Sequence, residues 1–438
     1  MAKKDYSVKS LTAGDFPLPV RHFWTNTVGN AKIRLATTLA SIVCCCFLST
    51  RLRVKYVYDA FLSMLLLNLL VIKPSGSGKS LVRLVVNMLV KTQILRDLEE
   101  RRKLQANRGK NRRRATNRVG EEEYPAAVRV LQSFTPPAIV KYADNSARKF
   151  GGEPLSFLLF SDEIGVITDN RRYAGIMRDI ARTAYSLGEI YARDTAWEGG
   201  VNTCVDICWC SVLCGQESAL EKYIDKQGVI QGDASRQILV KDDDTLGEDA
   251  PTLRPFTEQQ QRDIEGAVSR LMGETFTDDG QLQPIHEVDM KWLDKDVKMW
   301  CGQQREIILK TGSRAHESFY VRASVSAFRI ATMLYHLWDE APSKQKQVRR
   351  CYWYFAQLIL DAQMAQWGQE YESALPKEKE CTQKPTLFDS MPKRFTRDQL
   401  REAVIKQELG TPARIFLHKW LSKKWIYEAE KDVFEKFY

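Results

Sequence analysis

The sequence predicts an α/β core built on a mainly parallel sheet, followed by a helical domain and a small C-terminal module of helices and a hairpin. Three observations support this prediction. Short apolar runs between residues 61 and 240 each end in a cluster of polar residues. From residue 257 to 375, apolar residues recur at intervals of three and four. The segment 385–438 has a pattern of its own, and 438 residues give room for two or three domains.

Residues 1–60 are expected to form a helical leader that packs beside the core. The apolar stretches 35–50 and 61–72 have 16 and 12 residues, fewer than the roughly 20 that a membrane-spanning helix needs. We therefore expect both stretches to be buried, and we expect no membrane partner. Residues 1–17 show no secretory signal, and the cysteine triplet at 44–46 does not fit a disulfide framework. These features predict a reducing, cytoplasmic location.

The most informative segment runs from residue 61 to residue 90. Its apolar first part is followed by a glycine-rich turn and then by the apolar stretch LVRLVVNMLV. Strand, glycine-rich turn and helix are the context of a phosphate-binding loop, or P-loop. Gly76 and Gly78 let successive N–H groups face one anion, and the helix that starts near Lys79 turns its positive dipole end to the same point. The predicted nucleotide-binding residues are Pro74, Ser75, Gly76, Ser77, Gly78, Lys79 and Ser80.

The chemistry of this turn predicts ATP and Mg²⁺ as ligands. Lys79 would reach the β- and γ-phosphates, and the Ser80 hydroxyl would complete the shell of the metal ion. The letters GSGKS also arise by chance in serine-rich loops, and Lys73 stands where the usual motif begins with glycine. The flanking strand and helix favour the nucleotide site.

A second apolar run, residues 155–160, is expected to be a buried parallel strand and ends in Ser161-Asp162-Glu163. Asp162 would hold Mg²⁺, directly or through water. Glu163 would polarise the attacking water, as a general base or by orienting it. An acidic pair after a strand is also a common helix cap. Behind a P-loop, we favour ATP hydrolysis.

Residues 204–214 (CVDICWCSVLC) predict another central strand, which ends at Gly215-Gln216. Gln216 is the candidate sensor of the γ-phosphate, with Ser211 behind it. The four cysteines share one parity and are expected to be small buried hydrophobic residues instead of zinc ligands. The preceding segment 191–203 fits a plain hairpin better than a loop that contacts DNA.

Arg236 precedes the apolar run 237–240 and follows the sensor position in the chain. Ring ATPases place at this point an arginine that reaches the nucleotide of a neighbouring subunit, where it stabilises charge in the transition state. A surface ion pair is the alternative role. The P-loop core is expected to span residues 61–245, and the acidic, proline-containing stretch 241–260 predicts a linker or exposed loop.

The helical domain is expected to span residues 257–375, with helices at 321–338 and 348–375. Its aromatic residues favour a bundle core over a base-stacking platform. They are Tyr352, Trp353, Tyr354, Phe355 and Trp367.

The C-terminal module, residues 385–438, has a winged-helix pattern. A short helix at 386–391 precedes a helix at 397–408 with Thr396 as its N-cap; a second helix starts at Pro412 and runs to residue 424. Residues 425–427 and 433–437 would pair as a hairpin. The second helix would expose the nucleic-acid contacts Arg414, Lys419 and Lys423, and its buried stripe would come from Ile415, Phe416, Leu417, Trp420 and Leu421. Winged helices also dock proteins.

Basic charge is concentrated in two places within a chain of net charge +10. Residues 101–118, an insertion in the core, carry nine Lys and Arg and no acid, and residues 393–425 carry nine against three acids. This concentration indicates an anionic polymer as partner, namely single-stranded or duplex DNA. The predicted contacts in the insertion are Arg112, Arg113 and Arg114. A solvated arm without a ligand is the alternative.

In this order, IKPSGSGKS, FLLFSDEIG, CWCSVLCGQES and DASRQILV resemble a family of primase–helicase-type P-loop ATPases of phages and mobile elements, notably of Bacteroides relatives. The resemblance covers roughly residues 30–375. It implies a RecA/AAA+-like core and a ring-forming replicative helicase, often associated with a primase. By motif, Lys79 and Ser80 would bind phosphate and metal, Asp162 and Glu163 would serve hydrolysis, and Arg236 would act in a neighbouring subunit.

The sequence leaves three functions open. The first is an ATP-driven DNA helicase or translocase, a homo-oligomer with a hexamer favoured, acting in replication or mobility of a mobile element with a primase or recombinase partner. The second is an AAA+-type initiator, loader or mobility regulator that binds duplex DNA and uses ATP as an assembly switch. The third is a structural or defence-related assembly whose oligomerisation is controlled by nucleotide.

Overall fold

The computed structural model describes residues 10–113, 126–132, 135–165, 174–185, 190–193, 203–242, 249–374, 387–407, 409, 412–422 and 425–436. The chain forms two compact units, residues 1–372 and residues 373–438. The predicted leader, core and helical segments all belong to the first unit, up to residue 372.

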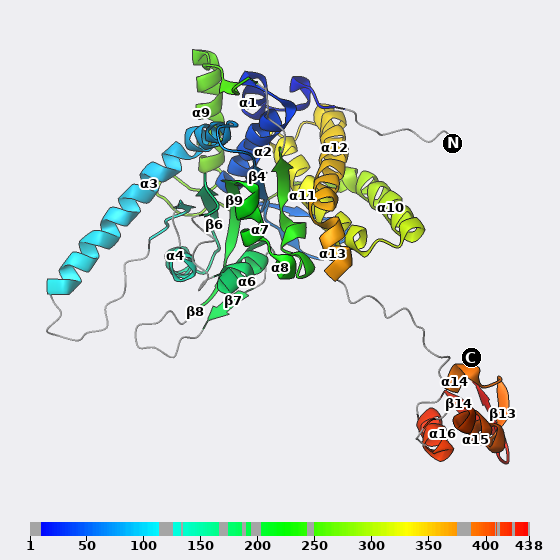
Figure 1. Ribbon diagram of the computed structural model, residues 1–438. Coiled ribbons are helices and arrows are strands. Elements are labelled where there is room, and N and C mark those ends of the chain that lie inside the picture. Colours follow the sequence, from blue (N-terminus) through cyan, green and yellow to red (C-terminus); the bar gives the residue numbers. More distant parts are fainter. Residues whose placement is uncertain are drawn as a thin grey trace. The chain divides into compact units, whose positions relative to one another are not determined.

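A five-stranded parallel sheet forms the centre of the first unit (Figure 1). Its strands lie in the order β10-β4-β9-β6-β5. Their bounds are β4 Asn68–Ile72, β5 Val130–Leu131, β6 Ser156–Ser161, β9 Cys208–Gly215 and β10 Ile238–Lys241. The predicted α/β class with a parallel sheet is therefore confirmed, and it is compatible with a Rossmann- or RecA-like core.

The cysteine-rich strand differs from the prediction, because residues 203–215 form two strands instead of one. β8 (Thr203–Asp206) pairs antiparallel with β7 (Ile190–Arg193), and β9 enters the parallel sheet after Ile207. This pairing agrees with the hairpin interpretation of the segment, and residues 194–202 lie outside the described residues.

Helices cover both faces of the sheet. The larger core packs α2 (Ala31–Leu48), α3 (Lys79–Arg113), α11 (Arg314–Leu337) and α12 (Gln345–Gln363) against one face. Cys208, Cys210 and Cys214 point into this core, as their shared parity predicts. On the opposite face, Phe157 and Trp209 pack in a smaller core with α4 (Pro136–Lys149) and α6 (Ala174–Tyr185).

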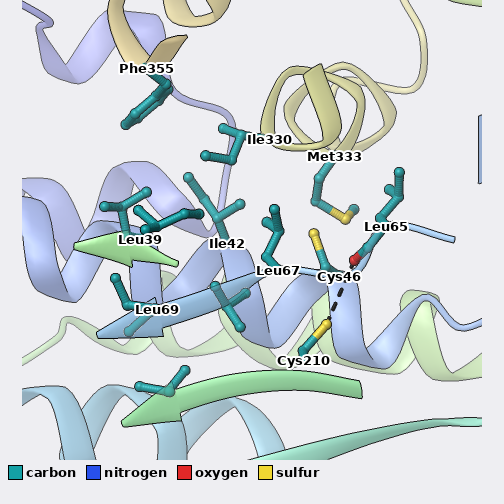
Figure 2. Packing of buried hydrophobic residues seen from close by; sticks show 14 of the residues in the cluster. Leu39, Ile42, Cys46, Leu65, Leu67, Leu69, Cys210, Ile330, Met333 and Phe355 are labelled. Carbon is teal, nitrogen blue, oxygen red and sulfur yellow. Dashed lines mark hydrogen bonds between the residues drawn. The ribbon is translucent and has the colours of Figure 1, made fainter. Parts of the chain in front are cut away.

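Helix α2 is buried over most of its length. Every residue from Leu35 to Leu48 is buried, since the helix is apolar on all sides and packs between the sheet and later helices. Figure 2 shows its Leu39 and Ile42 beside Leu69 of β4 and Ile330 of α11. Among the described helices, only α2 is long and apolar enough to cross a membrane, and 83% of it is buried in the protein.

Helix α3 begins at Lys79 and continues for 35 residues (Figure 1). At 1.5 Å per residue this corresponds to about 52 Å. Its first turns contribute buried valines to the core, whereas its last turns contain the start of the basic insertion and extend away from the sheet. The basic segment is therefore helical up to residue 113.

Helices dominate residues 257–374. They are α9 Glu258–Gly273, α10 Asp294–Thr311, α11, α12, a π-helical turn Met364–Gly368 and α13 Gln369–Ala374. Tyr352, Trp353, Phe355 and Trp367 are buried in the bundle as predicted, and Tyr354 is half-buried. The remaining elements of the first unit are α1 Val20–Asn26, β1 Thr27–Val28, β2 Leu52–Lys55, β3 Leu62–Ser63, α7 Glu217–Tyr223, α8 Lys226–Ile230, β11 Thr252–Leu253, β12 His286–Glu287 and 3₁₀ turns at Ala13–Asp15, Ala234–Arg236, Lys291–Leu293 and Pro342–Lys344.

The second unit has helices and a three-stranded antiparallel sheet around its own core. Its elements are α14 Leu387–Ser390, β13 Arg394–Thr396, α15 Arg397–Lys406, α16 Ala413–Ser422, β14 Ile426–Glu430 and β15 Val433–Lys436, and the sheet order is β13-β15-β14. Thr396 and Gln399 form a capping box, which confirms the predicted start of α15. The predicted hairpin is also present.

The buried stripe of α16 is narrower than predicted. Leu417 and Trp420 are buried and Phe416 packs against them, but Ile415 is 49% exposed and Leu421 is 38% exposed. A ten-residue helix on a small core covers only one narrow stripe, so apolar residues beside that stripe stay in contact with solvent.

Candidate functional site

The predicted site residues of the core follow neighbouring strands at the point where each strand ends. Lys73 follows β4, Gln216 follows β9 and Asp162 follows β6. Because these strands are adjacent and parallel, their carboxyl ends lie at the same edge of the sheet. β4 lies between two strands that come much later in the chain, and such a switch in strand order is where α/β sheets bind ligands.

The turn 73–80 connects β4 to α3. Gly76 and Gly78 have φ of +78° and +92°, a left-handed conformation that favours glycine. The Ser77 hydroxyl donates to the Pro74 carbonyl over 2.7 Å, which closes the turn. A Cβ on Gly78 would lie 2.3 Å from Cγ of Pro251, whereas a Cβ on Gly76 would meet open space. Gly78 is therefore required both for its conformation and for the close approach of Pro251.

Lys79 and Glu163 lie opposite each other at this edge. The Lys79 Nζ is 3.7 Å from Oε2 of Glu163, with the lysine largely buried and the carboxylate 44% exposed. The Ser161 hydroxyl donates to the Glu163 carbonyl over 2.9 Å and fixes the backbone after β6. Two residues that are 84 positions apart in the chain are thus brought together, as the motif order predicts.

Asp162 has a partner that sequence reasoning missed. Arg83 Nη1 lies 2.9 Å from Oδ2 of Asp162, and both side chains are about half exposed. Arg83 is four residues after Lys79, so the two cations share one face of α3. The four-residue spacing of Lys79 and Arg83 is the sequence feature that could have predicted a second cation beside the acidic pair.

Lys73, the departure from the usual motif, points into the protein. Its Nζ lies 2.6 Å from Oδ2 of Asp242 just after β10, and its side chain is only 1% exposed. Asn30, the N-cap of α2, donates to the same oxygen over 2.7 Å. Burial alone would raise the pKa of Asp242, but the hydrogen bonds from Lys73 and Asn30 outweigh it and hold that pKa below its ordinary value. Lys73 therefore anchors the turn to β10 and α2.

A cavity of about 240 Å³ lies beside the turn. Its walls are Lys73 and residues 75–77 of the turn, Asn30 and Ile33 at the start of α2, and the segment 249–251. Typical ligand pockets have roughly 300–1,000 Å³. This cavity is therefore large enough to enclose part of a nucleotide-sized ligand. Ser80, at the start of α3, is exposed.

Gln216 is exposed at the tip of β9 and is the N-cap residue of α7, but its side chain makes no capping hydrogen bond. It follows Gly215, where a Cβ would lie 3.7 Å from Oε1 of Glu163. Gln216 thus lies at the same edge as Lys79 and Glu163. Ser211 donates to Oδ1 of Asn68 over 2.9 Å inside the sheet and is buried away from solvent.

Arg236 lies just before the amino end of β10, whereas the turn 73–80 follows the carboxyl end of β4. It is therefore at the opposite end of the parallel strands. Its Nη1 donates to the Gly232 carbonyl over 2.7 Å, and its guanidinium lies 5.9 Å from the centre of the Tyr185 ring. The structure therefore does not bring Arg236 to the turn of its own chain. A contact with the nucleotide of a neighbouring subunit stays a prediction.

The predicted nucleic-acid contacts are only partly described. Arg112 and Arg113 belong to the last turn of α3, and Arg114 and Lys423 lie outside the described residues. Arg414 and Lys419 are exposed on α16.

In comparisons with known proteins, no protein-family model and no curated protein matches the chain. The likeness to mobile-element primase–helicase-type ATPases therefore depends on the sequence motifs alone.

Proposed function

We propose that the chain is a Mg²⁺-dependent ATPase with a RecA/AAA+-like P-loop core. The observation that carries this proposal is the Lys79–Glu163 pair, 3.7 Å apart, beside a turn with two left-handed glycines at the start of a long helix. Backbone N–H groups in such a turn and the positive end of α3 favour a phosphate group.

The residues of this edge have separable roles in hydrolysis. Lys79 binds the β- and γ-phosphates. Because the triphosphate carries more negative charge than Glu163, Lys79 leaves the Glu163 carboxylate when ATP binds, and this carboxylate then orients the attacking water. Ser80 and Asp162 both offer oxygen atoms that are open to solvent, and oxygen is the ligand that Mg²⁺ prefers. The metal ion would neutralise phosphate charge when bound. Gln216 lies where a side chain can contact the γ-phosphate.

The ATPase acts, in this proposal, as a ring-forming DNA helicase or translocase in replication or mobility of a mobile element. The basic arm at the end of α3 supports DNA binding, since it offers positive charge well away from the sheet. The position of Arg236 at the end of the strands opposite the turn supports a contact between subunits, because one subunit can then present it to the next.

An initiator or loader is the second candidate, and the second unit favours it. Its helices and hairpin fit a winged-helix module, in which α16 would lie in the major groove. Arg414 and Lys419 are exposed on that helix. A separate DNA-binding unit suits a protein that binds duplex sites and uses ATP to control assembly.

Phosphate release and nucleotide binding test the ATPase. Lys79→Ala should weaken ATP binding about 10- to 100-fold, the value of a charged hydrogen bond. Glu163→Gln should keep binding and lower kcat about 10²- to 10⁴-fold. Lys91→Ala and Glu221→Gln, which change exposed residues on α3 and α7, are the matched controls. Unchanged turnover in Glu163→Gln would remove this residue from the reaction.

DNA distinguishes the two candidates. A translocase should hydrolyse ATP several-fold faster with single-stranded DNA and displace a strand, and it should form a ring with an ATP analogue. An initiator should bind duplex DNA, hydrolyse slowly and displace nothing. ATP turnover that no DNA changes, in a chain that stays monomeric, would contradict both. Arg236→Ala should stop turnover in the oligomer without a large loss of nucleotide affinity.

A further inference from the structure

Two histidines and two glutamates converge at a point remote in sequence from the turn 73–80. His286 is on β12, His336 lies in the last turn of α11, Glu340 follows that helix, and Glu274 is the C-cap residue of α9. The His286 Nε2 lies 2.6 Å from Oε1 of Glu340, and the His336 Nδ1 lies 3.1 Å from the same oxygen. The strand residue His286 and the end of α11 thus meet at the Glu340 carboxylate, and Glu274 contacts His336 from its other side.

The three donor atoms have the spacing of a metal-binding group. His286, His336 and Glu340 offer one atom each, and all three atoms lie within 4.8 Å of one another. A tetrahedral Zn²⁺ binds nitrogen and oxygen at about 2.0–2.2 Å, which separates its ligand atoms by about 3.3–3.5 Å. The two nitrogen–oxygen distances in the structure, 2.6 and 3.1 Å, need to widen by less than 1 Å.

The second nitrogen of His336 is already oriented for such a site. His336 Nε2 lies 2.8 Å from Oε2 of Glu274. A histidine that binds a metal through one nitrogen and donates its other N–H to a carboxylate has the usual orientation of zinc-bound imidazole. With Nδ1 on the metal, the remaining proton of His336 is on Nε2 and serves Glu274.

The charges around the cluster favour a dication. Glu274, Glu340 and the neighbouring Asp339 are acidic, and among the described residues Arg270 pairs with Asp339 and Glu274. With both histidines neutral, these four groups leave a net charge of −2.

The backbone at residues 339 and 340 has an unfavourable conformation. Asp339 and Glu340 have φ of +54° and +55°, a left-handed conformation that is unfavourable for residues other than glycine. Hydrogen bonds from their N–H groups to the His336 and Tyr335 carbonyls close the end of α11. This turn places the Glu340 carboxylate beside His286 and His336. Strained residues held in this way often mark functional sites.

We propose that His286, His336 and Glu340 bind Zn²⁺, with Glu274 as the positioning residue for His336. Two imidazoles and one carboxylate suit zinc better than magnesium, which prefers oxygen ligands. The fourth position is open to solvent, since the His286 side chain is 52% exposed. The metal fastens β12 and the end of α9 to the end of α11, so this site is distinct from the Mg²⁺ site of the proposed ATPase.

Calorimetric titration of the EDTA-treated full-length chain with ZnCl₂ tests the proposal. One equivalent of Zn²⁺ should bind, with excess Mg²⁺ present throughout, and Co²⁺ in its place should give the visible absorption of a tetrahedral site. His286→Gln and Glu340→Gln should abolish this binding. Glu274→Gln should weaken it about 10- to 100-fold. His418→Gln, an exposed histidine of the second unit, is the matched control and should bind as the wild type does.

The variants also separate metal binding from folding. Since the His286 side chain is half exposed, His286→Gln should keep the wild-type circular dichroism and urea midpoint in EDTA, and it should lose only the stabilisation that Zn²⁺ adds to the wild type. A wild-type chain without saturable Zn²⁺ binding would overturn the proposal. So would equal Zn²⁺ affinity in the wild type and in the His286→Gln and Glu340→Gln variants.

Discussion

Replacing Asp242 by asparagine removes the negative partner of a lysine that has no access to water. The Lys73 side chain is 1% exposed and its Nζ lies 2.6 Å from the Asp242 carboxylate. At an effective dielectric constant of about 20, two unit charges at this distance attract by about 6 kcal/mol. Asparagine keeps part of the hydrogen bonding, and loss of one partner of a buried pair costs about 3–5 kcal/mol. We expect Asp242→Asn to lower the free energy of unfolding by that amount.

The reverse change should cost less. Lys73→Met leaves Asp242 10% exposed to water and still bonded to Asn30, so we expect a loss of about 1–3 kcal/mol. The double variant Lys73→Met with Asp242→Leu replaces the pair by apolar side chains, which is often close to neutral. It should be more stable than Asp242→Asn alone.

Urea unfolding followed by circular dichroism gives the three free energies from midpoint and slope. Nucleotide binding provides a second measurement, because a lysine that only anchors the turn should not touch the phosphates. Lys73→Met should bind ATP far better than Lys79→Ala does. The reasoning is refuted if Asp242→Asn is within 1 kcal/mol of the wild type, or if the double variant loses the sum of the two single losses.

Three further predictions follow from single features. Gly78→Ala, with φ of +92° and Pro251 in the way, should cost more stability than Gly76→Ala, which has open space and about 1–2 kcal/mol of backbone strain; equal urea midpoints would contradict this. Because the pKa of Asp242 is lower in the folded chain, ionised Asp242 should add its full contribution to the free energy of unfolding above about pH 5. This contribution should be lost as the pH falls from the ordinary pKa of about 3.9 to the lower pKa of the folded chain. Equal losses of stability in acid for the wild type and Asp242→Asn would exclude this prediction. Trp420→Ala should cost the second unit about 3–5 kcal/mol, and ATP binding by the first unit should not change, as calorimetry with nucleotide can show.

Local signals in the sequence predicted the elements that local physics decides. Asp162 and Gln216 were placed at strand ends because polar residues follow apolar runs there, and parallel strands bring such ends together. Thr396 is predictable as an N-cap because a threonine hydroxyl at the start of a helix needs only the N–H groups of the first turn. The strand, turn and helix around Lys79 are likewise predicted by adjacent residues alone.

Contacts between residues far apart in the chain could not be predicted from local sequence patterns. The contact between Lys73 and Asp242 depends on the neighbouring position of β4 and β10, which no short segment encodes. His286 and His336 are 50 residues apart and meet only through a strand pairing and the end of a helix. The two-strand structure of residues 203–215 and the exposure of Ile415 likewise depend on what packs against each segment.

The length of α3 has a mechanical consequence. The helix starts at Lys79, beside the Glu163 carboxylate, and runs without interruption to Arg113. A rotation of about 5° at its first turn would displace the far end by about 4–5 Å, since the helix is about 52 Å long. A small rotation at Lys79 would therefore become a displacement of several ångströms at the end of the helix that contains Arg112 and Arg113.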